Sequence, residues 1–305
     1  MNTDARTPAD SYYGYPALKP PVWTWEVPAY FFVGGTAGAA ALIGAVARRS
    51  GADPDLVRDA RWIAAAGGAL SPPLLISDLG RPERFLNMLR VFKVRSPMSV
   101  GAWTLVAFSN AAAASAFADL AHRVTRGRLT LRIVSDASDV LSAATGLVLA
   151  TYTGVLLGAT SIPVWSNNAR LLPLHFGASG LGSAASMLEL LGHRDRALNM
   201  IGIGAALAET AFALHLALSD DEATRALHLG GAGALGRAAG ALSGPVPLLL
   251  RLFASRSSNA RRLAALSTIA GSILTRAAWI EAGKSSAGSA QAIATKSRRT
   301  EVVVD

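Results

Sequence analysis

The stretch VPAYFFVGGTAGAAALIGAVA (27–47) decides the fold class of this chain. It contains no charged side chain, while Glu26 precedes it and Arg48 and Arg49 follow it. About 20 apolar residues are enough for a helix to cross the hydrocarbon core of a bilayer, so the stretch predicts a transmembrane helix. The segment before it is aromatic and proline-rich without a basic run, so we expect a retained helix and no cleaved signal peptide.

Seven further apolar windows follow almost end to end. The chain is 51% hydrophobic and 16% charged, whereas soluble domains carry about a quarter charged residues. A backbone inside a bilayer must satisfy its hydrogen bonds within the chain, as helices or closed barrels do, and these windows lack the alternation of barrel strands. The sequence therefore predicts an all-α, polytopic transmembrane helix bundle of about eight spans in two four-helix halves. The expected spans are 27–47, 62–79, 99–118, 139–160, 171–191, 197–218, 226–250 and 263–281.

The spans divide the chain into three parts. We expect residues 1–26 to form an extramembrane arm, residues 27–283 the transmembrane domain and residues 284–305 a polar tail. The Pro72–Pro73 pair predicts a kink in the second span, and the glycine-rich seventh span is the weakest of the eight. The small residues of the Gly34–Gly38 pair predict close helix packing.

Composition excludes several classes of partner and site. The net charge of +9 could suggest nucleic acid, but Arg and Lys cluster where the apolar windows end, as membrane-flanking residues do. We therefore expect membrane lipids and no nucleic acid as partners. The chain has no cysteine, which excludes disulfides, thiolate-held zinc and cysteine-ligated iron–sulfur clusters within it.

Charge also predicts an orientation. Eight spans would place both termini on one side of the membrane, side A, together with the 80–98 connection. If that connection is basic for function, the steady arginine content of the opposite side, side B, makes side B cytoplasmic. We therefore expect a multi-pass protein of a bacterial inner membrane with extracytoplasmic termini. The arginines of side B are Arg48, Arg49, Arg58, Arg61, Arg123, Arg126, Arg128, Arg132, Arg194, Arg196, Arg251, Arg256, Arg261 and Arg262.

The connection after the second span is far richer in charge than the others. It also contains Phe85, Leu86, Met88 and Phe92 in an amphipathic pattern. A purely solvated loop would not need these apolar residues, so the segment is expected to lie under a partner protein or on lipid headgroups. The basic residues expected to dock the partner are Arg81, Arg84, Arg90, Lys93 and Arg95.

Four blocks of sequence resemble one family. The motif SDLGRPERFLNMLRVFKVRSPMSVGAW (77–103) resembles the signature of the NrfD/PsrC family of polysulfide-reductase-like membrane subunits. The arm YYGYPALKPPVWTWEVPAYFFVGG (12–35) is similar to that family's entry into the first helix. TYTGVLLGATSIPVW (151–165) resembles its fourth helix, and GSILTRAAWIEAGKSSA (271–287) its last helix. The blocks lie in the family's order and cover most of the chain.

The resemblance implies an eight-helix subunit without haem. Such a subunit binds exchangeable quinone or menaquinone and passes electrons to or from a four-cluster ferredoxin-like iron–sulfur subunit. That partner connects to a molybdopterin-type catalytic subunit. The resemblance also places the quinone site in the first half of the bundle, on the face that meets the iron–sulfur subunit.

Ionisable residues inside spans are costly and therefore indicate a functional site. Glu26, Asp78, Tyr152 and Glu209 all fall in the half of the expected bundle nearest side A, although they come from four spans. We expect Tyr152 to hydrogen-bond a quinone carbonyl, as the family match also implies, and Glu26 and Asp78 to accept protons. Glu209 is expected to relay protons or to pair with Arg276. The residues expected to bind the quinone are Glu26, Tyr30, Trp103 and Tyr152.

Each of these roles has a plainer alternative. Tyr152 can be an interfacial or core tyrosine. Glu26 can be a helix-entry carboxylate, and Asp78 can form a salt bridge with Arg81 or Arg84. These alternatives need no quinone, so the chain as a whole could be a purely structural membrane anchor.

Two other classes of protein fit the sequence less well. A cytochrome b anchor needs facing axial histidines, and only His175 and His215 lie within spans, so we expect no haem. A secondary transporter needs broken helices in both halves, and the Pro72–Pro73 pair is the one break that the sequence predicts.

Overall fold

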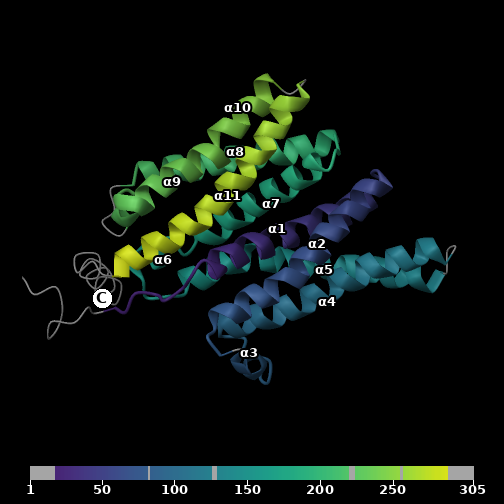
Figure 1. The fold of residues 1–305 in the computed structure, drawn as a ribbon, viewed down its shortest axis with the longest axis horizontal. Coiled ribbons are helices and arrows are strands. Elements are labelled where there is room, and N and C mark those ends of the chain that lie inside the picture. The colour runs from purple at the N-terminus through teal and green to yellow at the C-terminus, as the bar shows by residue number, and fades with distance from the viewer. Residues whose placement is uncertain (1–17, 82, 126–128, 220–223, 255–256, 288–305) are drawn as a thin grey trace, which may run out of the picture.

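The computed structural model describes residues 18–81, 83–125, 129–219, 224–254 and 257–287. Within these residues all regular structure is helical (Figure 1), so the all-α prediction is confirmed. Most of the expected arm, residues 1–17, and most of the expected tail, residues 288–305, lie outside the described residues. The described end of the tail continues the last helix. The helices are α1 (Glu26–Arg49), α2 (Pro54–Asp78), α3 (Glu83–Met88), α4 (Pro97–Val124), α5 (Leu129–Gly158), α6 (Pro163–Asn167), α7 (Leu171–Leu190), α8 (Arg196–Ala217), the 3-10 turn η2 (Arg225–Leu227), α9 (Gly230–Ser243), α10 (Pro245–Phe253) and α11 (Ser258–Ala287).

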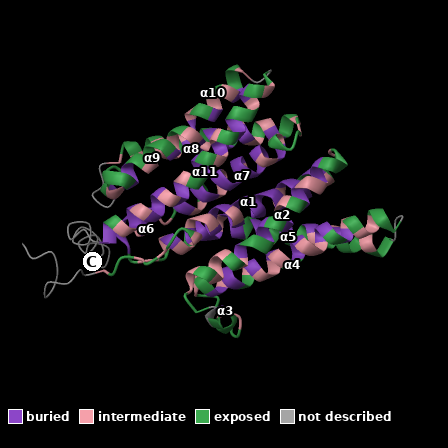
Figure 2. Ribbon diagram, viewed as in Figure 1, coloured by how far each residue is buried: buried purple, intermediate pink, exposed green. Residues whose placement is uncertain are grey.

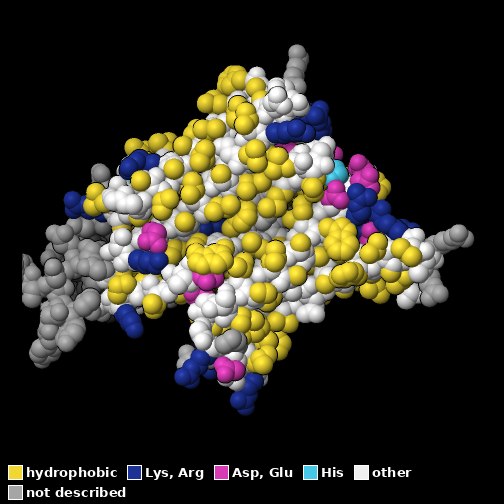
Figure 3. Space-filling view, in the orientation of Figure 1, with side chains coloured by type: hydrophobic (Ala, Val, Ile, Leu, Met, Phe, Trp, Pro, Cys, Tyr) yellow, Lys and Arg dark blue, Asp and Glu magenta, His cyan; other side chains and the backbone are white. Residues whose placement is uncertain are grey.

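Long helices occupy the expected spans. Five of the described helices, α1, α4, α5, α8 and α11, are long and apolar enough to cross a membrane. The 25-residue α2 and the 20-residue α7 pack beside them. Figure 3 shows hydrophobic side chains over the middle of one face and Lys and Arg side chains toward the ends. A membrane helix bundle is therefore confirmed, while the count of eight spans stays a prediction.

The seventh expected span is interrupted. α9 ends at Ser243 and α10 begins at Pro245, with Gly244 between them at φ −104° and ψ −97°, far from helical values. Proline lacks an N–H for the helical ladder, which favours a new helix start at this point. The expectation that the second half contains no break was therefore wrong. By contrast, α2 continues through Pro72–Pro73 to Asp78.

Helix α1 lies at the centre of the bundle. It packs against α2 and α5 on one side and against α7 and α11 on the other, and Figure 2 shows it buried along most of its length. Its glycines make this possible. A Cβ added at Gly38 would collide with the carbonyl of Gly146 on α5, and one at Gly35 would lie 3.3 Å from the guanidinium of Arg276 on α11.

A polar contact joins the two halves at side B. His193 Nε2, in the turn after α7, lies 2.8 Å from Asp59 Oδ2 on α2. Arg58 Nε donates to the other oxygen of Asp59 at 3.1 Å. Partial burial opposes ionisation of Asp59, but the hydrogen bonds from His193 and Arg58 outweigh it and hold the pKa of this carboxyl below its usual range. The contact between His193 and Asp59 joins the start of α2 to the second half.

We predict that Gly38→Ala destabilises the bundle. The added methyl has no space against Gly146, so α1 and α5 must separate, which is expected to cost about 1–3 kcal/mol or more. The matched control is Gly204→Ala in α8, where nothing lies within 4 Å of the added Cβ. Thermal unfolding in detergent should show a lower Tm for Gly38→Ala and an unchanged or higher Tm for Gly204→Ala. Equal shifts in the two variants would contradict the close contact.

Candidate functional site

A pair of carboxyl groups meets at the side A end of the bundle. Glu26 begins α1 and Asp78 ends α2, and antiparallel neighbours bring these ends together. Thr24 links the two. Its hydroxyl contacts Glu26 Oε2 and lies 3.0 Å from Asp78 Oδ1, and its backbone N–H donates to the same Asp78 oxygen at 3.3 Å. A hydroxyl has one proton to donate, so at any moment it can serve only one of the two carboxylates.

Aromatic stacking holds Thr24 in place. The ring of Trp23 stacks on Trp165 with centroids 5.2 Å apart and an angle of 15° between planes. The Trp165 indole N–H donates to the carbonyl of Trp279 at 2.7 Å, and Gly283 leaves room for the Trp165 ring. Trp23 is therefore fixed to the second half of the bundle, while the next residue, Thr24, forms hydrogen bonds with the first half.

Two buried tyrosines lie deeper in the first half. Tyr30 is one turn beyond Glu26 on α1, and Tyr152 on α5 packs its ring against Gly101 of α4, where any Cβ would overlap the ring. The helices that carry them, α1 and α5, pack against each other. Neither hydroxyl has a hydrogen-bond partner among the described residues. A tyrosine hydroxyl without a protein partner can hydrogen-bond a ligand.

A second polar cluster lies in the other half. Trp279 Nε1–H donates to His175 Nδ1 at 3.3 Å, so the ring proton of a neutral His175 sits on Nε2, which lies 3.1 Å from Glu209 Oε2. Ser243 also donates to Oε2, at 2.8 Å. The other oxygen of Glu209, Oε1, has no described partner, and Glu209 lines a cavity of about 50 Å³. This volume suits ordered water.

Arg276 is fully buried without a carboxylate at ion-pair distance in the described chain. Its Nη1 donates to the hydroxyls of Ser179 at 2.8 Å and Ser272 at 2.6 Å. Its guanidinium also lies 5.1 Å from the ring centre of Phe176 and 5.9 Å from that of Phe32. Serine oxygens and aromatic faces therefore hold this cation. Glu209 is expected either to relay protons or to pair with Arg276. The structure does not bring Glu209 to ion-pair distance of Arg276.

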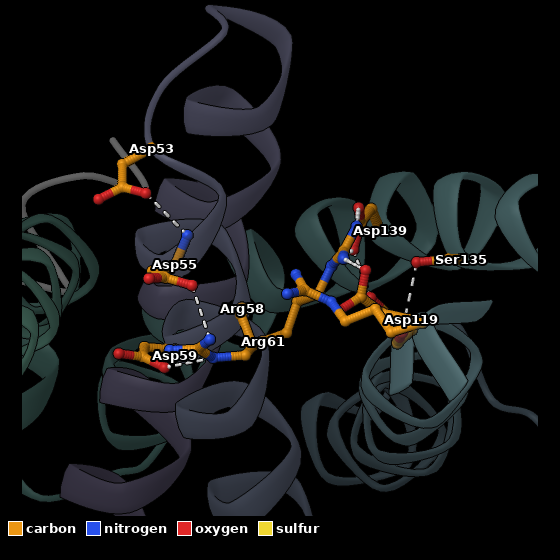
Figure 4. Close-up of polar contacts among 10 residues, drawn as sticks. Asp53, Asp55, Arg58, Asp59, Arg61, Asp119, Ser135 and Asp139 are labelled. Carbon is orange, nitrogen blue, oxygen red and sulfur yellow. Dashed lines mark hydrogen bonds and ion pairs between the residues drawn. The ribbon is translucent and has the colours of Figure 1, made fainter. Parts of the chain in front are cut away.

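An ion-pair cluster, which sequence reasoning missed, lies in the half of the bundle nearest side B. Figure 4 shows Arg61 of α2 reaching between α4 and α5. Its Nε and Nη2 bond the two oxygens of Asp139 at 3.0 and 2.5 Å, and its Nη1 lies 2.7 Å from Asp119 Oδ1. Ser115 donates to Asp139 as well. The expected second span begins at residue 62, which makes Arg61 a flanking residue, but the structure buries it.

The structure separates Trp103 from the tyrosines. Trp103 is two residues from Gly101 on α4, and side chains two apart on a helix point in different directions. Its side chain is 39% exposed and its ring contacts Phe92 of the 80–98 connection, with centroids 6.2 Å apart. Trp103 therefore does not share a site with Tyr152.

The expected docking residues lie on the surface. Arg81, Arg90, Lys93 and Arg95 are exposed, and the side chain of Arg84 lies outside the described part of the structure. Exposed apolar side chains accompany the cations: Leu86, Val91, Phe92 and Val94. Phe85 alone among the expected apolar contacts is buried in the bundle. The connection thus presents a mixed basic and apolar surface at side A.

Comparison with known proteins identifies one family. A family model described as polysulfide reductase, NrfD, matches residues 10–289, which span the arm, both halves of the bundle and the last helix. Comparison with curated proteins gives no match.

We predict that Arg61→Gln strongly destabilises the bundle, since the buried Asp139 loses its two-pronged ion pair and Asp119 keeps only Arg123. Loss of one partner from a buried ion pair typically costs about 3–5 kcal/mol. The control is Arg58→Gln, one turn away on α2, whose ion pairs with Asp55 and Asp59 are more exposed and whose loss should cost about 1 kcal/mol or less. Unfolding in detergent measures both, and similar losses in the two variants would contradict a buried cluster.

Proposed function

This chain belongs to the polysulfide reductase (NrfD) family, and we propose that it is the quinone-interacting subunit of a multi-subunit respiratory oxidoreductase. The family makes it a membrane subunit of an oxidoreductase complex, associated with catalytic and iron–sulfur subunits. In our proposal it binds quinone or menaquinone near side A. It exchanges electrons with a four-cluster ferredoxin-like subunit that connects to a molybdopterin-type catalytic subunit.

One observation carries the proposal: Tyr152 is a buried residue whose hydroxyl has no hydrogen-bond partner among the described residues. Tyr30, on the neighbouring helix α1, lies one helix turn from Glu26 of the carboxyl pair. A quinone needs a donor to its carbonyl oxygen and an apolar surround, and Tyr152 against Gly101 offers both. Tyr152 lies six residues before the end of α5. At 1.5 Å per residue this is about 9 Å along the helix axis from that end.

The carboxyl pair supplies the proton step in this proposal. Oxidation of a quinol to a quinone releases two electrons and two protons. The protons pass to Glu26 and Asp78, which share the Thr24 hydroxyl and open to side A. The electrons leave for clusters held by the partner, because this chain has no cysteine to bind such clusters itself.

The mixed surface of the 80–98 connection suits the docking of the iron–sulfur subunit. It combines exposed cations with exposed apolar groups, as interfaces between subunits do. The connection also follows α2 directly, so a protein bound there would lie near Asp78, the last residue of α2.

The rival haem site fits the residues poorly. Both ring nitrogens of His175 are already hydrogen-bonded, to Glu209 and to Trp279, and His215 is exposed on α8. Axial ligation would require His175 to give up one of these bonds. A purely structural anchor is the alternative that the next experiment tests.

We predict that Tyr152→Phe lowers quinol-coupled turnover of the assembled complex roughly tenfold or more, because the transition state loses a hydrogen-bond donor. The control is Thr151→Val, which removes a hydroxyl one residue away that bonds only carbonyls of its own helix. Turnover is measured with a soluble quinol, and co-purification shows assembly. Unchanged turnover in an assembled Tyr152→Phe complex would favour the anchor.

We further predict that Thr24→Val slows quinol-coupled turnover severalfold, because Glu26 and Asp78 lose the hydroxyl that links them. Thr125→Val serves as control, because that hydroxyl bonds a carbonyl of its own helix at side B. Turnover equal to that of the unmodified protein would remove the carboxyl pair from the proton step.

A further inference from the structure

A polar cavity of about 520 Å³ opens at side B, in the opposite half of the bundle from the proposed quinone site. It lies between the end of α1, the end of α4 and the start of α5. Its walls carry Arg48, Arg49, Arg132 and three carboxylates, with Ala45 and Val140 as apolar contacts. None of the residues in the proposed quinone chemistry lines it.

The three carboxylates are already neutralised. Asp139 is bonded by Arg61, as Figure 4 shows. Asp119 pairs with Arg61 at 2.7 Å and with Arg123 at 2.9 Å. Asp136 pairs with Arg48. Three guanidinium groups therefore balance three carboxylates, and no carboxylate in this wall is left to hold a cationic ligand.

Two guanidinium groups are left over. Arg49 and Arg132 line the cavity, are exposed to it, and have neither an ion pair nor a hydrogen bond with any described residue. Arg48 lines the same cavity, so the cations repel one another unless an anion lies between them. The cavity thus offers two free planar donors, a geometry that matches phosphate oxygens.

The position of the cavity favours a lipid over a soluble anion. Arg49 is the last residue of α1, so the cavity lies where that helix leaves the hydrocarbon core. Val140 forms part of the wall, and Ile133, Val140 and Leu147 repeat every seven residues as exposed apolar side chains along α5. Residues at this spacing share one helix face. An apolar track therefore leads from the basic cavity toward the middle of the bilayer.

From these features we propose that the cavity binds an anionic phospholipid of the phosphatidylglycerol type. Its phosphate lies between Arg49 and Arg132, and its acyl chains follow the exposed face of α5. Basic pockets between transmembrane helices at a cytoplasmic surface are typical sites for anionic headgroups. The volume admits a glycerol phosphate headgroup, not merely a small ion. The proposal does not depend on quinone binding.

The test is thermal unfolding of the full-length chain, delipidated in detergent, with added phosphatidylglycerol, phosphatidylcholine or inorganic phosphate. We expect phosphatidylglycerol to raise the Tm by several degrees more than phosphatidylcholine. The double variant Arg49→Gln/Arg132→Gln should lose that excess. Both side chains are exposed and lack described partners, so the variant should fold.

A matched control separates this site from general surface charge. Arg194→Gln/Arg196→Gln removes the same charge from exposed positions at the same side, outside the cavity, and should keep the full phosphatidylglycerol effect. Native mass spectrometry should find the lipid retained on the unmodified protein and on the control, and lost from the Arg49→Gln/Arg132→Gln variant. An equal loss in the control, equal stabilisation by both lipids, or an equal effect of inorganic phosphate would overturn the proposal.

Discussion

A bilayer offers no water to buried polar groups, so each charged side chain inside this bundle must find its partners on neighbouring helices. Three buried arginines do so in different ways. Arg61 binds two carboxylates from α4 and α5. Arg251 makes a two-pronged pair with Glu189, both contacts at 2.7 Å, in space left by Gly202. Arg276 uses serine hydroxyls and aromatic faces. Each arrangement joins side chains from different helices and so helps to fix the relative positions of those helices.

Because buried polar groups need partners in a bilayer, a buried polar atom without one is informative. A polar atom that is buried without a partner is costly, so it is retained where something else binds it. Glu209 Oε1 is such an atom in this bundle. Tyr152, in the other half, is a buried residue whose hydroxyl has no hydrogen-bond partner among the described residues. Tyr152 belongs to the first half, which also carries Glu26 and Asp78. Glu209 faces a cavity too small for more than water, so it is not where we place the proposed quinone.

Much of this arrangement could be predicted from the sequence. Charge-free windows predict helices in lipid with few alternatives, and the convergence of Glu26 and Asp78 follows from antiparallel spans. The link through Thr24 could not be predicted, because the arm's path depends on Trp23 stacking on a residue 142 positions later. Trp103 points outward because the face of α4 that carries Gly101 packs against the ring of Tyr152. In a uniformly apolar helix the sequence does not reveal which face packs inward. Arg61 was placed at a boundary because hydropathy cannot distinguish a flanking cation from a buried one.

The break between α9 and α10 explains why the seventh window was the weakest in the sequence. A continuous apolar helix there would present no polar group to α8, yet Glu209 on α8 needs a donor. Ser243 ends α9 and supplies it. Gly244 follows, and a Cβ at that position would lie 2.8 Å from Thr210 Oγ1, the residue after Glu209. Small and polar residues at the interruption therefore let α9 approach Glu209 closely, at the expense of the hydropathy that marks a membrane span.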